Sequence, residues 1–283
     1  MEKKGIVLEG GGHRGIYSAG VLDVLYENNV IADGIIGVSA GAVHGASYAS
    51  GQPGRSVRYT AKYCGDKRYM SMLSLFKTGD MFNEDFCYHE IPEKLDPYDF
   101  NALESSHTAF YVTCTDVQTG KPVYHLCRTL RGSEMKWMQA SASMPLVSKI
   151  VEVDGYRMLD GGMADSIPEE AFEKMGYTKN IVILTQPAGY IKEKNTMLPL
   201  IRVALKKYPA LVRDMETRHT CYNRELIAVE QKAEKGEILL IRPSADLKVS
   251  RTEKDPDKIR ALYNLGRQDA AAQLKAVKLF YHL

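Results

Sequence analysis

Short apolar runs alternate with apolar residues at helical spacing along the first fifty residues. Residues 5–9, GIVLE, form an apolar run that predicts a buried strand, and a glycine-rich loop follows it. Apolar residues then recur every three or four positions over 16–25, and Asn28 and Asn29 are expected to end that helix. A second apolar run at 31–38 leads into small residues that suit a helix packed closely on a sheet. This alternation favours a parallel sheet covered by helices.

The rest of the chain carries further strand and helix patterns. Six more apolar runs predict strands, at 108–114, 123–126, 149–153, 156–159, 181–185 and 238–242. Between residues 199 and 236 the pattern turns helical. One apolar stripe there indicates core packing, and it consists of Val212, Met215, His219, Tyr222, Leu226 and Val229.

The C-terminal segment predicts a last helix. Asp255 followed by Pro256 is a favourable N-cap and first helical position. One helix face follows, made by Ile259, Leu262, Tyr263, Ala270 and Leu274. Because the sequence has neither internal repeats nor a low-complexity linker, we expect a single domain over 1–283. Its motif-bearing core is expected at 5–190, with a helical part at 191–283 packed on it.

The composition is that of a globular protein without a strong charge bias. The 283 residues are 45% hydrophobic, and 37 basic against 35 acidic side chains give a net charge of +2. That balance gives no reason to expect a nucleic-acid partner, which usually requires a basic patch. Five cysteines lie far apart without a C-x-x-C pair, so neither a disulfide framework nor a zinc knuckle is expected. No run approaches the ~18 apolar residues of a membrane span, and the N-terminal run is too short for a signal peptide, so we expect a cytoplasmic protein.

The glycine-rich loop IVLEGGGHRGI has two interpretations. Gly10-x-Gly12-x-x-Gly15 matches a dinucleotide-binding fingerprint, which makes a nucleotide-binding oxidoreductase an alternative function. Such a fold also needs an acidic residue about 20 positions further on, at the end of the second strand, for the ribose hydroxyls. The nearest acid, Asp33, comes before the apolar core of that strand, and Ser39 occupies the expected place. The dinucleotide interpretation is therefore the weaker one.

Ser39 lies in GVSAG, a G-x-S-x-G sequence between a predicted strand and a predicted helix. This is the nucleophile-elbow pattern. The serine must occupy a strained turn so that its hydroxyl projects from the strand end, and Gly37 and Gly41 leave room for the strand and helix to cross. The amides at the helix start favour developing negative charge. Ser39 is therefore the candidate nucleophile.

The first loop then has a part in the same chemistry. An acyl-transfer enzyme needs hydrogen-bond donors for the oxyanion of its tetrahedral intermediate. Gly10, Gly11 and Gly12 can present their N–H groups without side chains in the way, and Arg14 brings a permanent cation. Both an oxyanion hole and a pyrophosphate site depend on exposed amides at a helix start. Because Ser39 occupies the place of the ribose-binding acid, we predict that this loop forms an oxyanion hole rather than a pyrophosphate site.

Two glycine motifs within thirty residues, GGGxRG and then GxSxG, resemble the patatin-like phospholipase family. The third mark of that family, an Asp-Gly-Gly or Asp-Gly-Ala turn, is matched by Asp160, Gly161 and Gly162 in MLDGGMADSIP. The stretches QASASMPL and CTDVQTG also resemble the family, and KKYPALVRDM, CYNREL and LIRPS resemble a bacterial branch of it. The resemblance implies a three-layer α/β/α fold with a mostly parallel central sheet and a helix-rich C-terminal third.

The resemblance also implies a serine–aspartate dyad, and this selects Asp160. From the residues alone, the Asp-Gly turns at Asp33 and Asp154 are alternatives. Asp160 is favoured locally because it ends an apolar strand and precedes two glycines. Only His219 and His282 follow it in the order that a triad would need, and neither has a loop context suited to a base.

In the expected mechanism, Asp160 takes the proton of the Ser39 hydroxyl, an acyl-enzyme forms, and Asp160 then activates water. A free aspartate has a pKa near 3.9 and is a poor base for an alcohol. We therefore expect the site to be partly desolvated, because burial raises the pKa of a carboxyl group.

The resemblance implies hydrolysis of fatty-acyl esters in phospholipids, lysophospholipids or acylglycerols, with no cofactor and no metal. Transient contact with a membrane surface has two candidate segments. The first is 67–86, which we expect to form either a mobile flap over an acyl-chain pocket or a short buried helix. The second is 198–208, which we expect to form either an interfacial segment or an ordinary surface helix. A lipid-binding protein with a decayed site is a further alternative, disfavoured because Ser39, Asp160, Arg14 and the glycines are all present.

Overall fold

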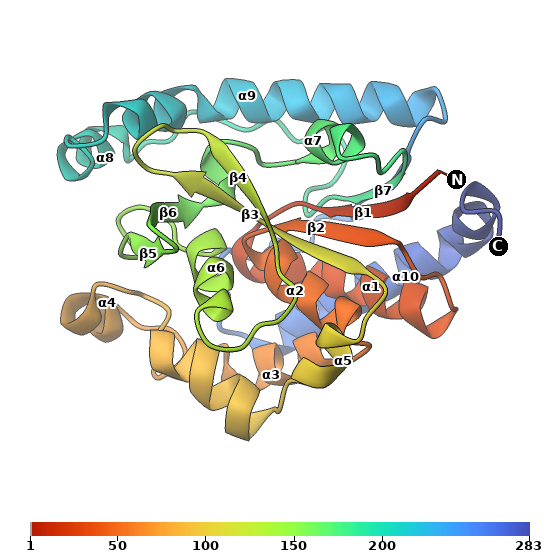
Figure 1. Cartoon of the computed structure of the whole chain (residues 1–283), viewed down its shortest axis with the longest axis horizontal. Helices are drawn as coiled ribbons and strands as arrows, with labels where there is room; N and C mark the ends of the chain where they lie inside the picture. The colour runs from red at the N-terminus through yellow and green to blue at the C-terminus, as the bar shows by residue number, and fades with distance from the viewer. Residues whose placement is uncertain (1) are drawn as a thin grey trace.

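The computed structural model describes residues 2–283, and an eight-stranded sheet lies at its centre (Figure 1). The strands are β1 (Lys4–Leu8), β2 (Gly34–Val38), β3 (Ala109–Asp116), β4 (Pro122–Leu126), β5 (Val151–Val153), β6 (Tyr156–Asp160), β7 (Lys179–Ile183) and β8 (Leu239–Ile241). Each of the eight apolar runs that predicts a strand forms one. β1 and β2 are almost entirely buried, as expected for strands covered on both faces.

The sheet is parallel over most of its width. Its order is β5-β6-β3-β2-β1-β7-β8, and β4 pairs with β3 outside this path. The strands from β3 through β2, β1 and β7 to β8 pair in parallel. β4 and β6 pair with β3 antiparallel, and β5 and β6 form an antiparallel pair at the edge. The mostly parallel central sheet is therefore confirmed.

Helices cover both faces of the sheet. On one face lie α7 (Glu169–Lys174) and α9 (Pro209–Glu234), and on the other lie α1 (Ile16–Glu27), α2 (Ala40–Ala49) and α10 (Pro256–Phe280). Successive side chains of β1 point to opposite faces, so Ile6 packs in the core with α1 and α10, whereas Val7 packs with α7 and α9. These two cores make the three-layer α/β/α architecture visible in Figure 1.

The remaining helices are short. They are the 3₁₀ turns η1 (Gly12–Gly15) and η3 (Gly161–Met163), the π-helical η2 (Phe86–Leu95), and α3 (Arg55–Tyr63), α4 (Met72–Thr78), α5 (Phe100–Glu104), α6 (Glu134–Ser141) and α8 (Leu198–Ala204). Several of them line the cavities described below.

The long C-terminal helices form as their patterns predict. The stripe on α9 faces the core, where Met215, Tyr222, Leu226 and Val229 are buried. α10 starts at the predicted cap, because the Asp255 carboxylate accepts hydrogen bonds from the N–H groups that follow it. The helix-rich C-terminal third is therefore confirmed.

The two segments considered for membrane contact both form surface helices. α4, within 67–86, leaves Met72, Leu73 and Phe76 exposed, so the alternative of a buried helix is wrong. α8, within 198–208, buries Ile201 but exposes Val203. Across residues 2–283 no helix is both long enough and apolar enough to cross a membrane.

Candidate active site

Ser39 forms a sharp turn between the end of β2 and the start of α2. Its backbone has φ 55° and ψ −123°, a conformation that costs a residue other than glycine about 1–3 kcal/mol. The neighbouring glycines make the turn possible: a Cβ atom on Gly37 would lie 2.5 Å from the Ala42 nitrogen, and one on Gly41 would lie 2.7 Å from the Leu8 oxygen. The G-x-S-x-G sequence therefore folds as strand, strained turn and helix, with a half-buried serine at the turn.

Asp160 is brought to Ser39 because β2 and β6 meet along the same edge of β3. β2 runs parallel to β3 and ends with Val38 opposite Thr113. β4 occupies the other edge over this stretch, so antiparallel β6, with Asp160 opposite Cys114, continues along the edge that β2 uses. The two strand ends thus face each other at neighbouring positions of β3. The separation of the serine and the carboxylate is fixed by the register of one strand.

The Asp160 carboxyl group lies in a buried, hydrogen-bonded environment. The residue is 2% exposed, and its Oδ1 accepts a hydrogen bond from the Gly162 N–H at 2.8 Å. Burial raises the pKa of Asp160 above its ordinary value, while the nearby Arg218 guanidinium and a hydrogen bond with the Ser39 side chain act in the opposite direction. The net increase is the direction that a general base requires.

Ser141, at the end of α6, holds the elbow in position. Its hydroxyl oxygen accepts a hydrogen bond from the Ser39 N–H at 2.9 Å and donates one to the Thr113 carbonyl at 2.7 Å. This residue lies inside QASASMPL, the small-residue stretch that resembles the family. The sequence alone gives Ser141 no role, because nothing in the local pattern shows that a hydroxyl there reaches back to β2.

The glycine loop after β1 lies directly against the elbow. A Cβ atom on Gly10 would lie 3.0 Å from the Ser39 Cβ and 2.9 Å from the Val38 oxygen. The N–H groups of Gly10 and Gly11 donate no hydrogen bond to any of residues 2–283, so they are available to a substrate atom. Gly12 also lines the small cavity in front of Ser39.

The residues predicted for the site come together. One small cavity is lined by Gly10, Gly11, Gly12, Arg14, Ser39, Asp160 and Gly162. The other glycines of the motifs lie behind it. Gly37 and Gly41 form the crossing of strand and helix, and Gly161 passes close to the Thr113 carbonyl, where a Cβ atom would clash.

The acid considered for a dinucleotide ribose lies elsewhere. Asp33 precedes β2, and its carboxylate accepts a hydrogen bond from the Lys4 N–H at 2.7 Å. It is therefore at the opposite end of β2 from Ser39, and five residues of extended strand separate the two.

A larger, mainly apolar cavity of about 360 Å³ opens on another side of Ser39. Its wall includes Val43, Tyr59, Phe82, Ile91 and Met138. The segment 67–86 contributes Tyr69, Met81 and Phe82 to this wall. Both cavities are bordered by Gly12, Ser39, Met144 and Arg251, so the candidate nucleophile lies at their boundary.

With this geometry established, comparison with known proteins decides the family. Residues 6–173, more than half of the chain, match the family model described as patatin-like phospholipase. The chain belongs to the patatin-like phospholipase family. The family predicted from the glycine motifs is therefore confirmed. A second model, a domain of unknown function, matches residues 208–282, which contain α9 and α10.

Relatives of this patatin-like chain include a bacterial protein and much longer eukaryotic ones. An uncharacterized Escherichia coli K12 protein, YjjU, is 28% identical over 192 residues, which are 65% of this chain and 52% of that protein. Lysophospholipase nte1 of Aspergillus terreus is 28% identical over 183 residues, 61% of this chain and 11% of that one. Neuropathy target esterase sws of Drosophila melanogaster is 25% identical over 184 residues, 63% of this chain and 12% of that one. The chain thus spans about half of the first and about a tenth of the other two.

A similar solved structure is that of VipD from Legionella pneumophila. It superimposes on the patatin-like chain with a TM-score of 0.48 and 13% identity, covering 98% of this chain and 67% of VipD.

Two histidines of this patatin-like chain border a cavity next to Ser39, but they are not the two that follow Asp160 in the sequence. His13 and His44 line the apolar cavity, whereas His219 and His282 line neither cavity. Burial lowers the pKa of His13 and lowers the pKa of His44 to about 3. Neither buried ring is therefore suited to hold a proton during catalysis near neutral pH.

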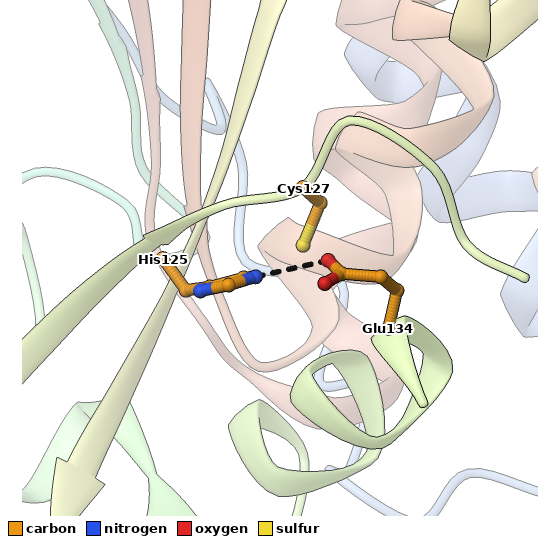
Figure 2. A group of neighbouring side chains, drawn as sticks. All are labelled: His125, Cys127 and Glu134. Atoms are coloured by element: carbon orange, nitrogen blue, oxygen red, sulfur yellow. Dashed lines mark hydrogen bonds and ion pairs between the residues drawn. The ribbon is translucent and has the colours of Figure 1, made fainter. Parts of the chain in front are cut away.

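One group within residues 2–283 has the composition of a metal site, and it lies outside both cavities. His125, Cys127 and Glu134 bring a ring nitrogen, a sulfur and a carboxylate oxygen within 4.8 Å of one another. Figure 2 shows the His125 ring pointing from β4 toward Glu134 at the start of α6; that contact is 2.9 Å, and the ring stacks on Trp137 at 4.1 Å. Burial raises the pKa of the Cys127 thiol, which disfavours the thiolate that a metal would need. The hydrogen bond and the stacking join β4 to α6.

Proposed function

We propose that this chain is a serine hydrolase that cleaves fatty-acyl esters of phospholipids, lysophospholipids or acylglycerols through Ser39 and Asp160. The observation that carries the proposal is the meeting of a strained serine and a buried carboxyl group on one edge of β3. Relatives named lysophospholipase and esterase support the same reaction class.

The proposed reaction uses Asp160 as the base in both half-reactions. Asp160 accepts the hydroxyl proton as the Ser39 oxygen attacks the ester carbonyl, and it gives that proton to the departing alcohol oxygen when the acyl-enzyme forms. In the second half, it takes a proton from water as the water oxygen attacks the acyl carbon, and it returns that proton to the Ser39 oxygen as the bond to the acyl group breaks and the fatty acid leaves. The free N–H groups of Gly10 and Gly11, with the Arg14 guanidinium beside them, would stabilise the oxyanion of each tetrahedral intermediate.

The apolar cavity is proposed to hold the acyl chain. Its wall is built from α2, α3, η2 and α6 and from the segment that follows α4, and Ser39 lies at its mouth. Transfer of a hydrocarbon chain from water into such a cavity is favourable by about 0.8 kcal/mol per CH₂ group. A fatty-acyl ester would therefore be oriented with its carbonyl carbon at the serine.

We further propose that residues 1–283 act as one domain, with the helical part at 191–283 packed on the motif-bearing core. Hydrogen bonds join the two parts at several points. The Tyr281 hydroxyl donates to the Gly5 carbonyl at 2.6 Å, and the Arg251 carbonyl accepts from the His13 N–H at 3.0 Å. Both core contacts involve β1 or the glycine loop after it, so removal of the C-terminal part would disturb the site itself.

A fluorophosphonate probe tests the proposed function. Such a probe forms a covalent bond with an activated serine, and we expect one adduct per chain, found by mass spectrometry on the peptide that contains Ser39. Incubation with a long-chain fatty-acyl ester should protect the serine from labelling. An unlabelled chain, or an adduct on another serine, would contradict the proposal.

Contact with a membrane surface is proposed through α4 and α8, which lie at the same end of the molecule in Figure 1. Phe76 on α4 is 82% exposed, and Lys77 follows it. We expect Phe76→Asp to weaken binding to anionic liposomes about tenfold, because insertion of this ring would be lost and a negative charge would be added. Co-sedimentation measures the binding.

The control for this prediction is Leu279→Asp, which changes a side chain of similar exposure, 76%, on α10. Equal effects of the two substitutions, or no effect of Phe76→Asp, would show that α4 does not contact the membrane.

A further inference from the structure

Basic side chains gather around the small cavity next to Ser39. Four of them line it, namely Arg14, Lys192, Arg218 and Arg251. Arg14 belongs to the glycine loop, but the other three lie C-terminal to the segment that matches the patatin-like model. Arg218 is on α9 and Arg251 precedes α10, within the stretch that matches a domain of unknown function. The C-terminal part therefore supplies most of the positive charge beside the dyad.

These four cations have no carboxylate partner of their own. Within the part of the chain that the structure describes, none of them forms a salt bridge. Glu9 also lines the cavity, but its carboxylate accepts hydrogen bonds from the Thr185 N–H and hydroxyl and from the Tyr222 hydroxyl, at 2.6, 2.9 and 2.8 Å. Asp160 accepts a hydrogen bond from the Gly162 N–H and lies near Arg218, so the two carboxylates face four basic side chains. The cavity thus has an excess of positive charge.

The protein holds these cations close together despite their repulsion. Burial, together with the charges of Arg218, Arg251 and Arg14, lowers the pKa of Lys192 to about 7. The backbone of Lys192 is fixed by Asn223, whose amide oxygen accepts its N–H at 2.8 Å and whose amide group donates to its carbonyl at 3.1 Å. The folded chain therefore bears the cost of clustered like charges, a cost that a bound anion would remove.

The size of the cavity suits a compact anion. Its volume is about 60 Å³, and since one water molecule needs about 10–15 Å³, it has room for about four to six waters. A phosphate group with its four oxygens needs a similar space, and guanidinium groups bind phosphate through paired hydrogen bonds.

We infer that this cavity binds the phosphate of the lipid head group, so that the substrates are acylated glycerophosphates rather than neutral acylglycerols. This inference rests on the proposed function, since it assumes that the ester is cleaved at Ser39. An amphiphile would lie across the serine, with its acyl chain in the apolar cavity, its ester carbonyl at the glycine loop and Arg14, and its phosphate among Lys192, Arg218 and Arg251. Ser39, which borders both cavities, marks where the ester would lie.

The test compares two substrates with the same acyl chain, 1-acylglycerol 3-phosphate and 1-acylglycerol. We expect the kcat/KM of the wild-type chain to favour the phosphate ester at least about tenfold, and Lys192→Gln or Arg251→Gln each to reduce that preference about tenfold, as expected for loss of one charge-assisted hydrogen bond. Arg218 is left unchanged in this test because it also contacts Gly162 and influences Asp160.

The matched control is Lys194→Gln, which removes the charge of an exposed lysine two positions from Lys192 that lines neither cavity. It should keep the preference of the wild type. A wild-type chain that prefers the neutral lipid, or a preference that neither cavity variant reduces, would overturn the inference.

Two further measurements separate the sources of phosphate and the two proposals. Inorganic phosphate and glycerol 3-phosphate should inhibit competitively. Inhibition by these ions without any preference among lipids would indicate a site for free phosphate and overturn the assignment to a head group.

Fluorophosphonate labelling is measured on the same samples. Labelled Ser39 without lipid preference would reject only the anion site. Calorimetric binding of glycerol 3-phosphate that Lys192→Gln weakens, in a chain that is not labelled, would reject the hydrolase and its substrates and leave only the anion site.

Discussion

Ser39→Ala is expected to reduce the kcat/KM for a fatty-acyl ester by about 10⁵–10⁶-fold, the scale of loss seen when a serine hydrolase loses its nucleophile. The alanine side chain cannot form the acyl-enzyme, and the glycine amides alone would leave only slight catalysis. Release of p-nitrophenol from a long-chain ester measures the rate. The same variant should not react with a fluorophosphonate.

Ser39→Gly provides a control for folding. Both variants should be inactive, but glycine adopts the backbone conformation at φ 55° without the strain that alanine keeps. The glycine variant is therefore expected to unfold at a higher temperature than Ser39→Ala. Residual turnover near the wild-type level in either variant would show that another group is the nucleophile.

The second large effect is expected for Asp160→Asn, with a loss of about 10⁴-fold in turnover, comparable to the loss when a triad aspartate is replaced by asparagine. The amide oxygen can still accept the Gly162 N–H, so the turn is kept. What the substitution removes is the ability to accept the proton of Ser39. Burst kinetics should show no acyl-enzyme, which separates a lost base from a lost binding site.

His219→Ala is the matched control. His219 follows Ser39 and Asp160 in the chain, as the histidine of a catalytic triad would, but it lines neither cavity. It should retain wild-type turnover. Near-normal activity of Asp160→Asn together with inactive His219→Ala would reject the dyad.

The pH dependence follows from the same group. Because burial raises the pKa of Asp160, the basic form is lost, and the rate should fall, at a higher pH than for a free aspartate. Stability is expected to change with pH in the opposite direction to the rate. Because the pKa of Asp160 is higher in the folded state than in the unfolded state, this group stabilises the fold below its unfolded pKa, and the contribution is lost as the pH rises through its folded pKa. Asp160→Asn should therefore be at least as stable as the wild type at neutral pH, by thermal unfolding.

Local patterns were sufficient to predict the layers of this fold. Each strand is an apolar run, and Asp255 before Pro256 marks the start of α10, because these signals depend on residues close together in sequence. The short helices around the cavities were harder to predict. The π-helical η2 contains Pro92, which ordinarily argues against a helix interior, and its shape depends on packing against distant segments.

The candidate site was predictable to different extents. Ser39 has its own local signal, since the turn requires glycines at fixed spacing. Asp160 has only a weak one, its place at the end of an apolar strand before two glycines, and the family resemblance was needed to select it among the Asp-Gly turns. The reason is that its role depends on a strand register between segments far apart in the chain.

The basic cavity gives no signal in the sequence at all. Lys192, Arg218 and Arg251 come from a loop, a helix and a second loop, and the net charge of the chain is only +2. Their proximity arises when the C-terminal helices pack on the sheet.

The junction of β2 and β6 on β3 separates what must stay constant for the proposed reaction from what can change. The chain between the two groups forms much of the wall of the proposed acyl-chain cavity, yet the strand ends that carry them are aligned by their register on β3. Insertions or deletions in the parts of the wall outside α6, whose Ser141 holds the elbow, would alter which fatty acids fit while leaving the proposed reaction centre untouched. Chain-length selectivity in such a scaffold can therefore diverge, or be engineered, without cost to the chemistry.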